Sequence, residues 1–180
     1  MFSIIGFHTC EDRGETDEEI RTKVPIKSKP HNQWFGEGYY FWTDSDRFAK
    51  SWGSYEKRFI SKFQIGFANQ NDVFDLVGNA SHQEEFNEML KLITEKNQNA
   101  DKMDISSVFY FLREHNILSQ YKAIKGCGNC YSVKGCFING KKEQLMFVNR
   151  IQLCLFDKNV ALTLENVIRH KEDSYEYVQS

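Results

Sequence analysis

The alternating segment 59–67 constrains the fold of this 180-residue chain more than any other part of its sequence. Large apolar side chains stand at positions 59, 63, 65 and 67, while Lys62 and Gln64 lie between them. A period of two is typical of a β-strand that buries one face. Aromatic residues make up 14% of the chain and suit pleated strands, so a β-rich mixed fold is favoured over a helical bundle.

Other strands are predicted toward both ends of the chain. Residues 2–8 form an almost wholly apolar run, which indicates a buried strand. In the aromatic segment 38–42, Tyr40 and Trp42 face one side and Tyr39 faces the other, because successive side chains of a strand alternate. The remaining predicted strands are residues 73–76, 121–125, 145–148 and 151–156.

A helical pattern replaces the strand pattern in the middle of the chain. Apolar residues recur at helical spacing from Phe86 to Ile93, and after a polar break a second helix is predicted near 105–115. Because strand patterns lie on both sides, we interpret about 80–118 as a helical insertion within one α+β domain.

The domain is predicted to span residues 1–164. Residues 165–180 are mostly polar and charged, so we predict a C-terminal tail there. The glycine-rich segment 126–140 is predicted to be a loop.

The net charge and the cysteine count indicate which binding partners and which cellular compartment to expect. The net charge of −2 gives no global attraction to nucleic acid or to an anionic membrane. The first residues lack a basic leader, and no apolar run approaches the ~20 residues of a membrane span. Five cysteines, an odd number, favour reduced thiols, so we expect a cytoplasmic protein with no membrane contact.

A histidine and a glycine–tyrosine motif form the most informative functional pattern. His8 ends the first predicted strand, and the segment 36–41, Gly-Glu-Gly-Tyr-Tyr-Phe, follows about thirty residues later. A lone histidine at a strand end is usually only a polar residue at the edge of a core. Together, however, these residues resemble the start of NAD-cleaving ADP-ribosyltransferases, in the poly(ADP-ribose) polymerase branch. Ala49 and Trp52 match the small and aromatic residues that follow in that family, and the resemblance covers about residues 4–53.

The resemblance implies a fold and a cofactor site. The fold would be a split pair of small sheets with surrounding helices, and NAD would be the co-substrate. His8 would hydrogen-bond a ribose hydroxyl and Tyr40 would stack on the nicotinamide. Gly38 would let the backbone approach the dinucleotide, and Tyr39 and Thr9 would complete the cofactor site, although many relatives have glycine where Thr9 stands.

The third element of the family is an acidic residue, or sometimes a substitute such as glutamine, at the head of a late strand. Glu143 and Gln144 fall where that element is expected, after the 121–125 strand. Adjacent side chains of a strand point to opposite faces, so only one of the two can face the cleft. Glu143 is the first candidate for the catalytic residue, and Gln144 is the alternative.

The segment before that strand is the predicted acceptor site. Lys141 and Lys142, with Tyr131 nearby, could contact phosphates and stack on bases, which slightly favours nucleic acid over protein as the acceptor. The simpler interpretation is a solvated lysine face.

Three cysteines in the same segment raise the question of a metal. Cys127, Cys130 and Cys136 could bind zinc if a fourth ligand were supplied. A single Cys-x2-Cys without a second pair is weak support, so we expect reduced thiols and no metal.

By resemblance, the predicted function is transfer of ADP-ribose from NAD to a macromolecular acceptor. A small enzyme of this kind is similar to bacterial toxins of toxin–antitoxin or phage-defence systems, which implies a neutralising antitoxin protein. An NAD glycohydrolase is one alternative, and a non-catalytic nucleic-acid-binding module with a cysteine-rich loop is another. An RNA 2′-phosphotransferase shares the fold, but its additional arginines and histidines have no evident counterparts here.

Overall fold

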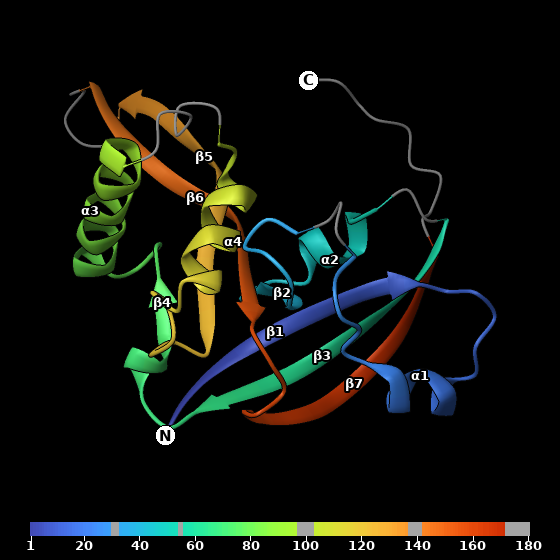
Figure 1. The fold of residues 1–180 in the computed structure, drawn as a ribbon. Helices are drawn as coiled ribbons and strands as arrows, with labels where there is room; N and C mark the ends of the chain where they lie inside the picture. Colours follow the sequence, from blue (N-terminus) through green and yellow to red (C-terminus); the bar gives the residue numbers. More distant parts are fainter. Residues whose placement is uncertain (30–32, 54–55, 97–102, 137–141, 172–180) are drawn as a thin grey trace.

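The computed structural model describes residues 1–29, 33–53, 56–96, 103–136 and 142–171, and for residues 129–149 it describes the backbone alone. These residues form a mixed α/β fold with a seven-stranded sheet in the order β4-β5-β6-β2-β1-β3-β7 (Figure 1). All neighbouring strands are antiparallel except β4 and β5. The strands are β1 (Phe2–Glu11), β2 (Tyr39–Thr43), β3 (Lys57–Phe67), β4 (Val73–Asp75), β5 (Ala123–Cys136), β6 (Lys142–Leu155) and β7 (Ala161–Lys171).

The sheet consists of two halves with a narrow junction. β1, β3 and β7 are paired over most of their length, and β2 joins β6 in the other half. Between β1 and β2, only Gly6–Thr43 and Phe7–Trp42 are paired. The split pair of sheets expected from the resemblance is therefore one hydrogen-bonded sheet, because these two residue pairs keep the halves connected.

Each half of the sheet has its own apolar cluster. The first packs around Phe59, Phe63 and Ile65 of β3 and includes Ile20 of α1 (Asp17–Lys23). The second packs around Phe74 and Phe109 and lies between the sheet and the helical insertion. The alternating apolar pattern of segment 59–67 thus forms the buried face of β3, as predicted.

The helical insertion is confirmed as two helices between β4 and β5. They are α3 (Ala80–Lys96) and α4 (Ile105–Glu114), which lie beside β4 and β5 in Figure 1. Asp104 caps α4, since its carboxylate accepts the Ser107 amide at 2.8 Å. A short helix, α2 (Arg47–Ser51), follows β2 and packs on β1 through Ala49.

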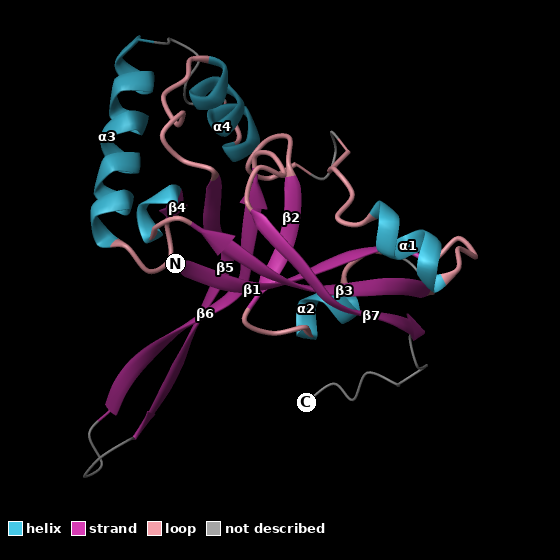
Figure 2. Cartoon of the chain, turned by 90° about the horizontal axis from the view of Figure 1, so that it is seen from below, coloured by secondary structure: helices cyan, strands magenta, loops and turns pink. Residues whose placement is uncertain are grey.

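Two sequence-based boundaries were wrong. The predicted loop 126–140 is largely strand, because β5 runs to Cys136 and pairs with β6, and the outer ends of both project from the body in Figure 2. Residues 165–171, assigned to a tail, belong to β7 and pair with β3.

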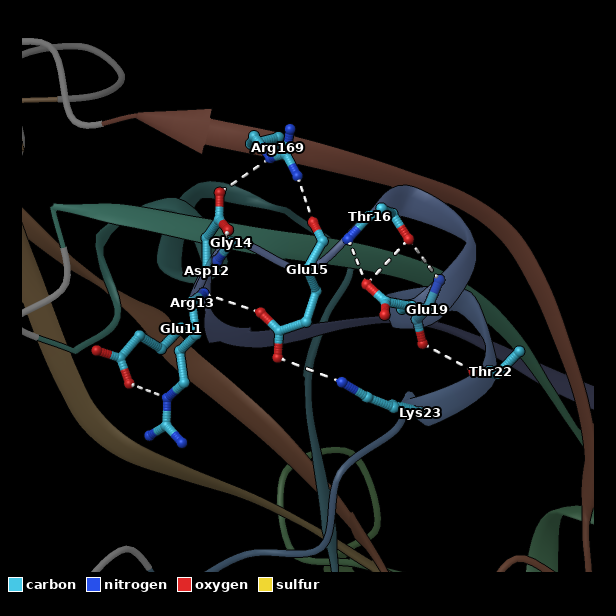
Figure 3. Close-up of polar contacts among 10 residues, drawn as sticks. All are labelled: Glu11, Asp12, Arg13, Gly14, Glu15, Thr16, Glu19, Thr22, Lys23 and Arg169. Atoms are coloured by element: carbon cyan, nitrogen blue, oxygen red, sulfur yellow. Dashed lines mark hydrogen bonds and ion pairs between the residues drawn. The ribbon is translucent and has the colours of Figure 1, made fainter.

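The polar end of β7 is held by ion pairs that its sequence does not reveal. Arg169 binds Asp12 at 2.9 Å, and its guanidinium also donates to the Glu15 carbonyl at 2.6 Å (Figure 3). Glu165 likewise binds Lys62 at 2.7 Å. A charged strand can therefore complete the sheet edge, since its polar side chains find partners on β3 and on the turn after β1.

Within the described residues, none of the helices is long and apolar enough to cross a membrane.

Candidate functional site at the separation of two strands

A cavity of about 610 Å³ lies where β1 and β2 separate. Beyond the Phe7–Trp42 pair the two strands no longer share backbone hydrogen bonds. The volume lies within the ~300–1,000 Å³ range of small-molecule and cofactor sites. The described lining residues include His8, Thr9, Cys10, Glu11, Arg13, Lys27, Lys29, Trp34, Tyr40, Trp42, Trp52, Arg150 and Gln152.

His8 bridges the gap between the separating strands. Its Nδ1 lies 2.9 Å from the Tyr40 carbonyl oxygen, and its Nε2 lies 3.1 Å from the Ile26 amide nitrogen. A carbonyl can only accept and an amide can only donate, so Nδ1 carries the proton and Nε2 accepts. Burial lowers the pKa of His8 to about 4, which keeps this neutral tautomer in place at neutral pH.

Tyr40 is fixed in place by its hydroxyl group. The hydroxyl donates to the Gly36 carbonyl at 2.7 Å and accepts from the Phe35 amide at 2.7 Å. Its ring stacks on Phe35, with centroids 6.3 Å apart and planes 9° apart. Burial raises the pKa of Tyr40, so the hydroxyl stays protonated and keeps both bonds. Tyr40 therefore presents a fixed ring to the cavity.

Of the other three residues assigned to the cofactor site, Thr9 lines the cavity, whereas Tyr39 and Gly38 are not among its described lining residues. Tyr39 packs against the first apolar cluster, on the face opposite to Tyr40, as the alternation predicted. A Cβ at Gly38 would collide with the Leu155 carbonyl oxygen and the Cys154 sulfur, so this glycine is needed for packing on β6. Thr9 lines the cavity while its hydroxyl donates to the Ala49 carbonyl at 3.0 Å, which ties β1 to α2.

Gln152 of β6 lines the same cavity as His8 and Tyr40, and no sequence motif had indicated it. It lies on β6 opposite Trp42, which in turn pairs with Phe7 of β1. Its side chain is 8% exposed and lines the cavity together with His8 and Tyr40. One signal was present, because Gln152 is the single polar residue within the apolar run 151–156 before Asp157.

The register gives Glu143 and Gln144 a different place from the one expected. They pair with Gly135 and Lys134 near the outer end of the β5–β6 hairpin. They precede Gln152 by nine and eight positions, so their backbone lies roughly 25–30 Å from it along an extended strand. Their side chains are outside the described part. The part of β6 that pairs with β2 therefore contains Gln152 and does not contain Glu143 or Gln144.

The predicted acceptor residues lie on the same hairpin. Lys142 pairs with Cys136, and Tyr131 pairs with Phe147, but the side chains of these residues are not among those described. Lys141 lies outside the described residues.

The three cysteines proposed for zinc are separated by the strand that contains them. β5 is continuous from Cys127 through Cys130 to Cys136. At ~3.3 Å per residue, these intervals span roughly 10 and 20 Å, whereas a zinc–sulfur bond is ~2.3 Å. One metal therefore cannot bind all three in this conformation. Among the described residues there is no group of three or more histidine, cysteine or acidic side chains that could hold a metal.

The described part of the cavity wall combines aromatic rings with cations. Trp34, Trp42 and Trp52 contribute aromatic surface, and Arg150 adds a positive charge. The described carboxylates of the wall are Glu11 and Glu15, and both are neutralised: Glu11 binds Arg13 at 2.7 Å, and Glu15 lies 3.5 Å from Lys23 (Figure 3). Such a wall suits a ligand with flat rings and negative charge.

No family model matches this chain, and neither the curated proteins nor the solved structures gave a significant match.

Proposed function

We propose that this protein is an NAD-dependent ADP-ribosyltransferase that cleaves the nicotinamide–ribose bond and transfers ADP-ribose to a macromolecular acceptor. One observation carries the proposal: His8, Tyr40 and Gln152, from three neighbouring strands, line a single cavity. The ADP-ribosyltransferase fold belongs to the same proposal, and it is supported by a sheet whose halves separate at this cavity. The toxin role and the antitoxin partner rest on the sequence resemblance alone.

The proposed binding of NAD follows from the chemistry of the wall. Tyr40 offers a fixed aromatic ring on which the nicotinamide can stack. Both nitrogens of His8 are already occupied, so in this proposal His8 is a positioning residue. It fixes Ile26 and the Tyr40 carbonyl, and it thereby sets the width of the cavity.

Gln152 determines which reaction the site favours. Cleavage of the nicotinamide–ribose bond builds positive charge on the ribose, as in glycoside hydrolysis. The Gln152 amide oxygen can accept a hydrogen bond from a ribose hydroxyl and orient the sugar. An amide cannot accept a proton from water, so Gln152 does not supply a general base. This favours transfer to a reactive acceptor over the alternative of NAD hydrolysis.

Substitution of Gln152 tests the proposal. Gln152→Ala should lower nicotinamide release from NAD by at least ~10-fold, because the ribose loses its orienting partner. Gln152→Glu should raise NAD hydrolysis in the absence of an acceptor, because a carboxylate stabilises the oxocarbenium-like state. Gln64→Glu introduces the same charge at an exposed position of β3 and is the matched control. Nicotinamide release that is unchanged in both Gln152 variants would exclude Gln152 from the reaction.

A further inference from the structure

Two arginines contact the ring of Phe48, and one of them, Arg150, lines the cavity. The guanidinium carbon of Arg47 lies 5.8 Å from the centroid of the Phe48 ring, and that of Arg150 lies 5.7 Å from it. The two residues come from α2 and β6, which are far apart in sequence. Both positive charges therefore lie against the same ring, and that of Arg150 also lies at the cavity.

Arg150 has a backbone conformation that is costly for a residue with a side chain. Its φ angle is 56°, in the left-handed region. It lies where the β5–β6 ladder is interrupted, between the pairs Cys127–Ile151 and Asn129–Asn149. A non-glycine residue pays ~1–2 kcal/mol in this region, and such strain is concentrated at functional sites. Arg150 stands two residues before Gln152, and both residues line the same cavity.

An exposed tryptophan completes this edge. Trp52 is 42% exposed and packs edge-on against Trp42 at 5.2 Å. The buried Arg58 donates to the Trp52 carbonyl at 3.0 Å, which fixes the backbone that carries the indole. Trp52 thus lines the same cavity as Arg150, and Trp42 connects it to Phe48, since the Trp42 and Phe48 ring centroids are 5.6 Å apart.

The two guanidinium groups are not neutralised by described residues. The acidic neighbour of Arg47, Asp46, forms its ion pair with Lys50 at 2.8 Å. Among the side chains that the structure describes, no carboxylate forms an ion pair with Arg47 or Arg150. The two arginines therefore add positive charge beside Phe48, and Arg150 adds it to the cavity that Gln152 also lines.

We propose that Arg47, Arg150 and Trp52 form the acceptor site, and that the acceptor is a terminal phosphate group of single-stranded nucleic acid. The two guanidinium groups would bind the phosphate, and Trp52 would stack on the terminal base. This inference deepens the proposed function and moves the acceptor site from the β5–β6 hairpin to the α2 edge.

A phosphate acceptor also explains why a glutamine can stand in the site. An oxygen of the phosphate monoester attacks the nicotinamide-ribose carbon and forms a new carbon–oxygen bond. The carbon–nitrogen bond breaks, and its electron pair passes to the nicotinamide ring, which leaves as a neutral molecule. The monoester loses one negative charge as the pyridinium loses its positive charge, and no proton is moved. The step therefore needs no general base.

Binding without NAD tests the acceptor site separately from the reaction. Fluorescein-labelled 12-nucleotide single-stranded RNA is titrated in three forms, with a 5′-phosphate, with a 3′-phosphate and with hydroxyl ends. We expect at least one phosphorylated form to bind about 10-fold more tightly than the hydroxyl form. The double variant Arg47→Gln, Arg150→Gln should abolish that difference. It should also reduce the slope of log affinity against log salt for the phosphorylated form by about 0.7, since one neutralised phosphate of a single strand contributes ~0.7. Trp52→Leu should weaken all three forms by at least ~5-fold.

Arg21→Gln provides the matched control, because Arg21 is an exposed arginine of α1 that does not line the cavity among the residues described. Equal binding of all three RNA forms, or wild-type binding by the double variant, would overturn the acceptor site. Preferential binding of poly-glutamate peptide would also overturn it and would point to a protein acceptor. RNA binding as predicted, without nicotinamide release from NAD under any condition, would refute the proposed function and leave the phosphate site standing.

Discussion

The two sides of β1 differ in how completely the strand is paired. Toward β3, every residue from Phe2 to Glu11 has a partner. Toward β2, pairing stops after two residue pairs, and the cavity begins. One strand thus has a closed side that belongs to the core and an open side that forms a site.

The difference between the two sides of β1 indicates how the cavity is kept open. A strand edge without partners leaves polar backbone groups unsatisfied. On the open side of β1, the His8 side chain donates to the Tyr40 carbonyl of β2, and the Thr9 hydroxyl donates to the Ala49 carbonyl of α2. At this site, the His8 side chain therefore replaces part of the β-ladder between β1 and β2.

The largest effect is expected for a ring on the open side. Tyr40→Ala should lower nicotinamide release from NAD by ~100-fold or more, because the stacking surface is lost together with the hydroxyl bonds that hold Phe35 and Gly36. Tyr39→Ala, on the opposite face, should mainly reduce the free energy of unfolding. Tyr40→Phe keeps the ring and removes only the hydroxyl, so it should retain more nicotinamide release than Tyr40→Ala. A reversed pattern for Tyr39 and Tyr40 in folded proteins would contradict the assignment of the two faces.

A substitution on the closed side should act through stability. Phe63 of β3 is 2% exposed and packs edge-on against Phe41 at 5.5 Å. Phe63→Ala should lower the free energy of unfolding by ~3–5 kcal/mol, measured by urea denaturation, because it leaves a cavity in the core. Phe63→Leu should lower the free energy of unfolding by less than Phe63→Ala. A loss below ~1 kcal/mol for the alanine variant would show that the closed side is not the tightly packed half.

The pH dependence of stability should identify His8. The folded protein keeps His8 neutral down to a pKa of about 4, whereas an unfolded histidine takes up a proton near 6.5. The unfolded state thus binds more protons between these values, and stability should fall as the pH drops from 6.5 to 4, by roughly 3 kcal/mol from this residue.

His8→Gln should remove that part of the pH dependence, and chemical denaturation at pH 7, 6 and 5 measures it. The control is His115→Gln, at an exposed histidine after α4. If the His8 variant has the same slope as the wild type, His8 is not held neutral by burial.

The smallest effect is expected at the outer edge of the closed half. Arg169 is about half exposed, and Asp12 is nearly buried, so their ion pair is partly screened by water. Arg169→Gln should lower the free energy of unfolding by about 1 kcal/mol in a thermal melt and leave nicotinamide release unchanged. If the variant loses more unfolding free energy than this, and the loss persists in 1 M salt, Arg169 stabilises the fold by packing on the Phe59 ring and not through its ion pair.

The sequence predicted those parts of the fold that depend on local periodicity. The strands around His8, Tyr40 and Phe63 and the helical insertion follow directly from spacing of apolar residues. The expected start near residue 80 agrees with α3, where the Asn79 side chain accepts the His82 amide at 3.3 Å. The strand β7 was missed because its charges have partners on distant residues such as Asp12.

The candidate site could be predicted only in part for the same reason. His8 and Tyr40 stand in recognisable motifs, and the fold brings both to one cavity. The choice of Gln152 over Glu143 depends on the pairing of β6 with β2, and register between strands distant in sequence is not encoded in either strand alone. The α2 edge depends on a left-handed Arg150, which no local pattern indicates.

The most direct test of the central claim is a crystal structure with carba-NAD, in which a methylene group replaces the ring oxygen of the nicotinamide ribose and prevents cleavage. We predict that the nicotinamide lies against the Tyr40 ring and that a hydroxyl of its ribose lies within ~2.7–3.2 Å of the Gln152 side chain. A dinucleotide bound elsewhere on the protein, with only water in the cavity between β1 and β2, would contradict this prediction.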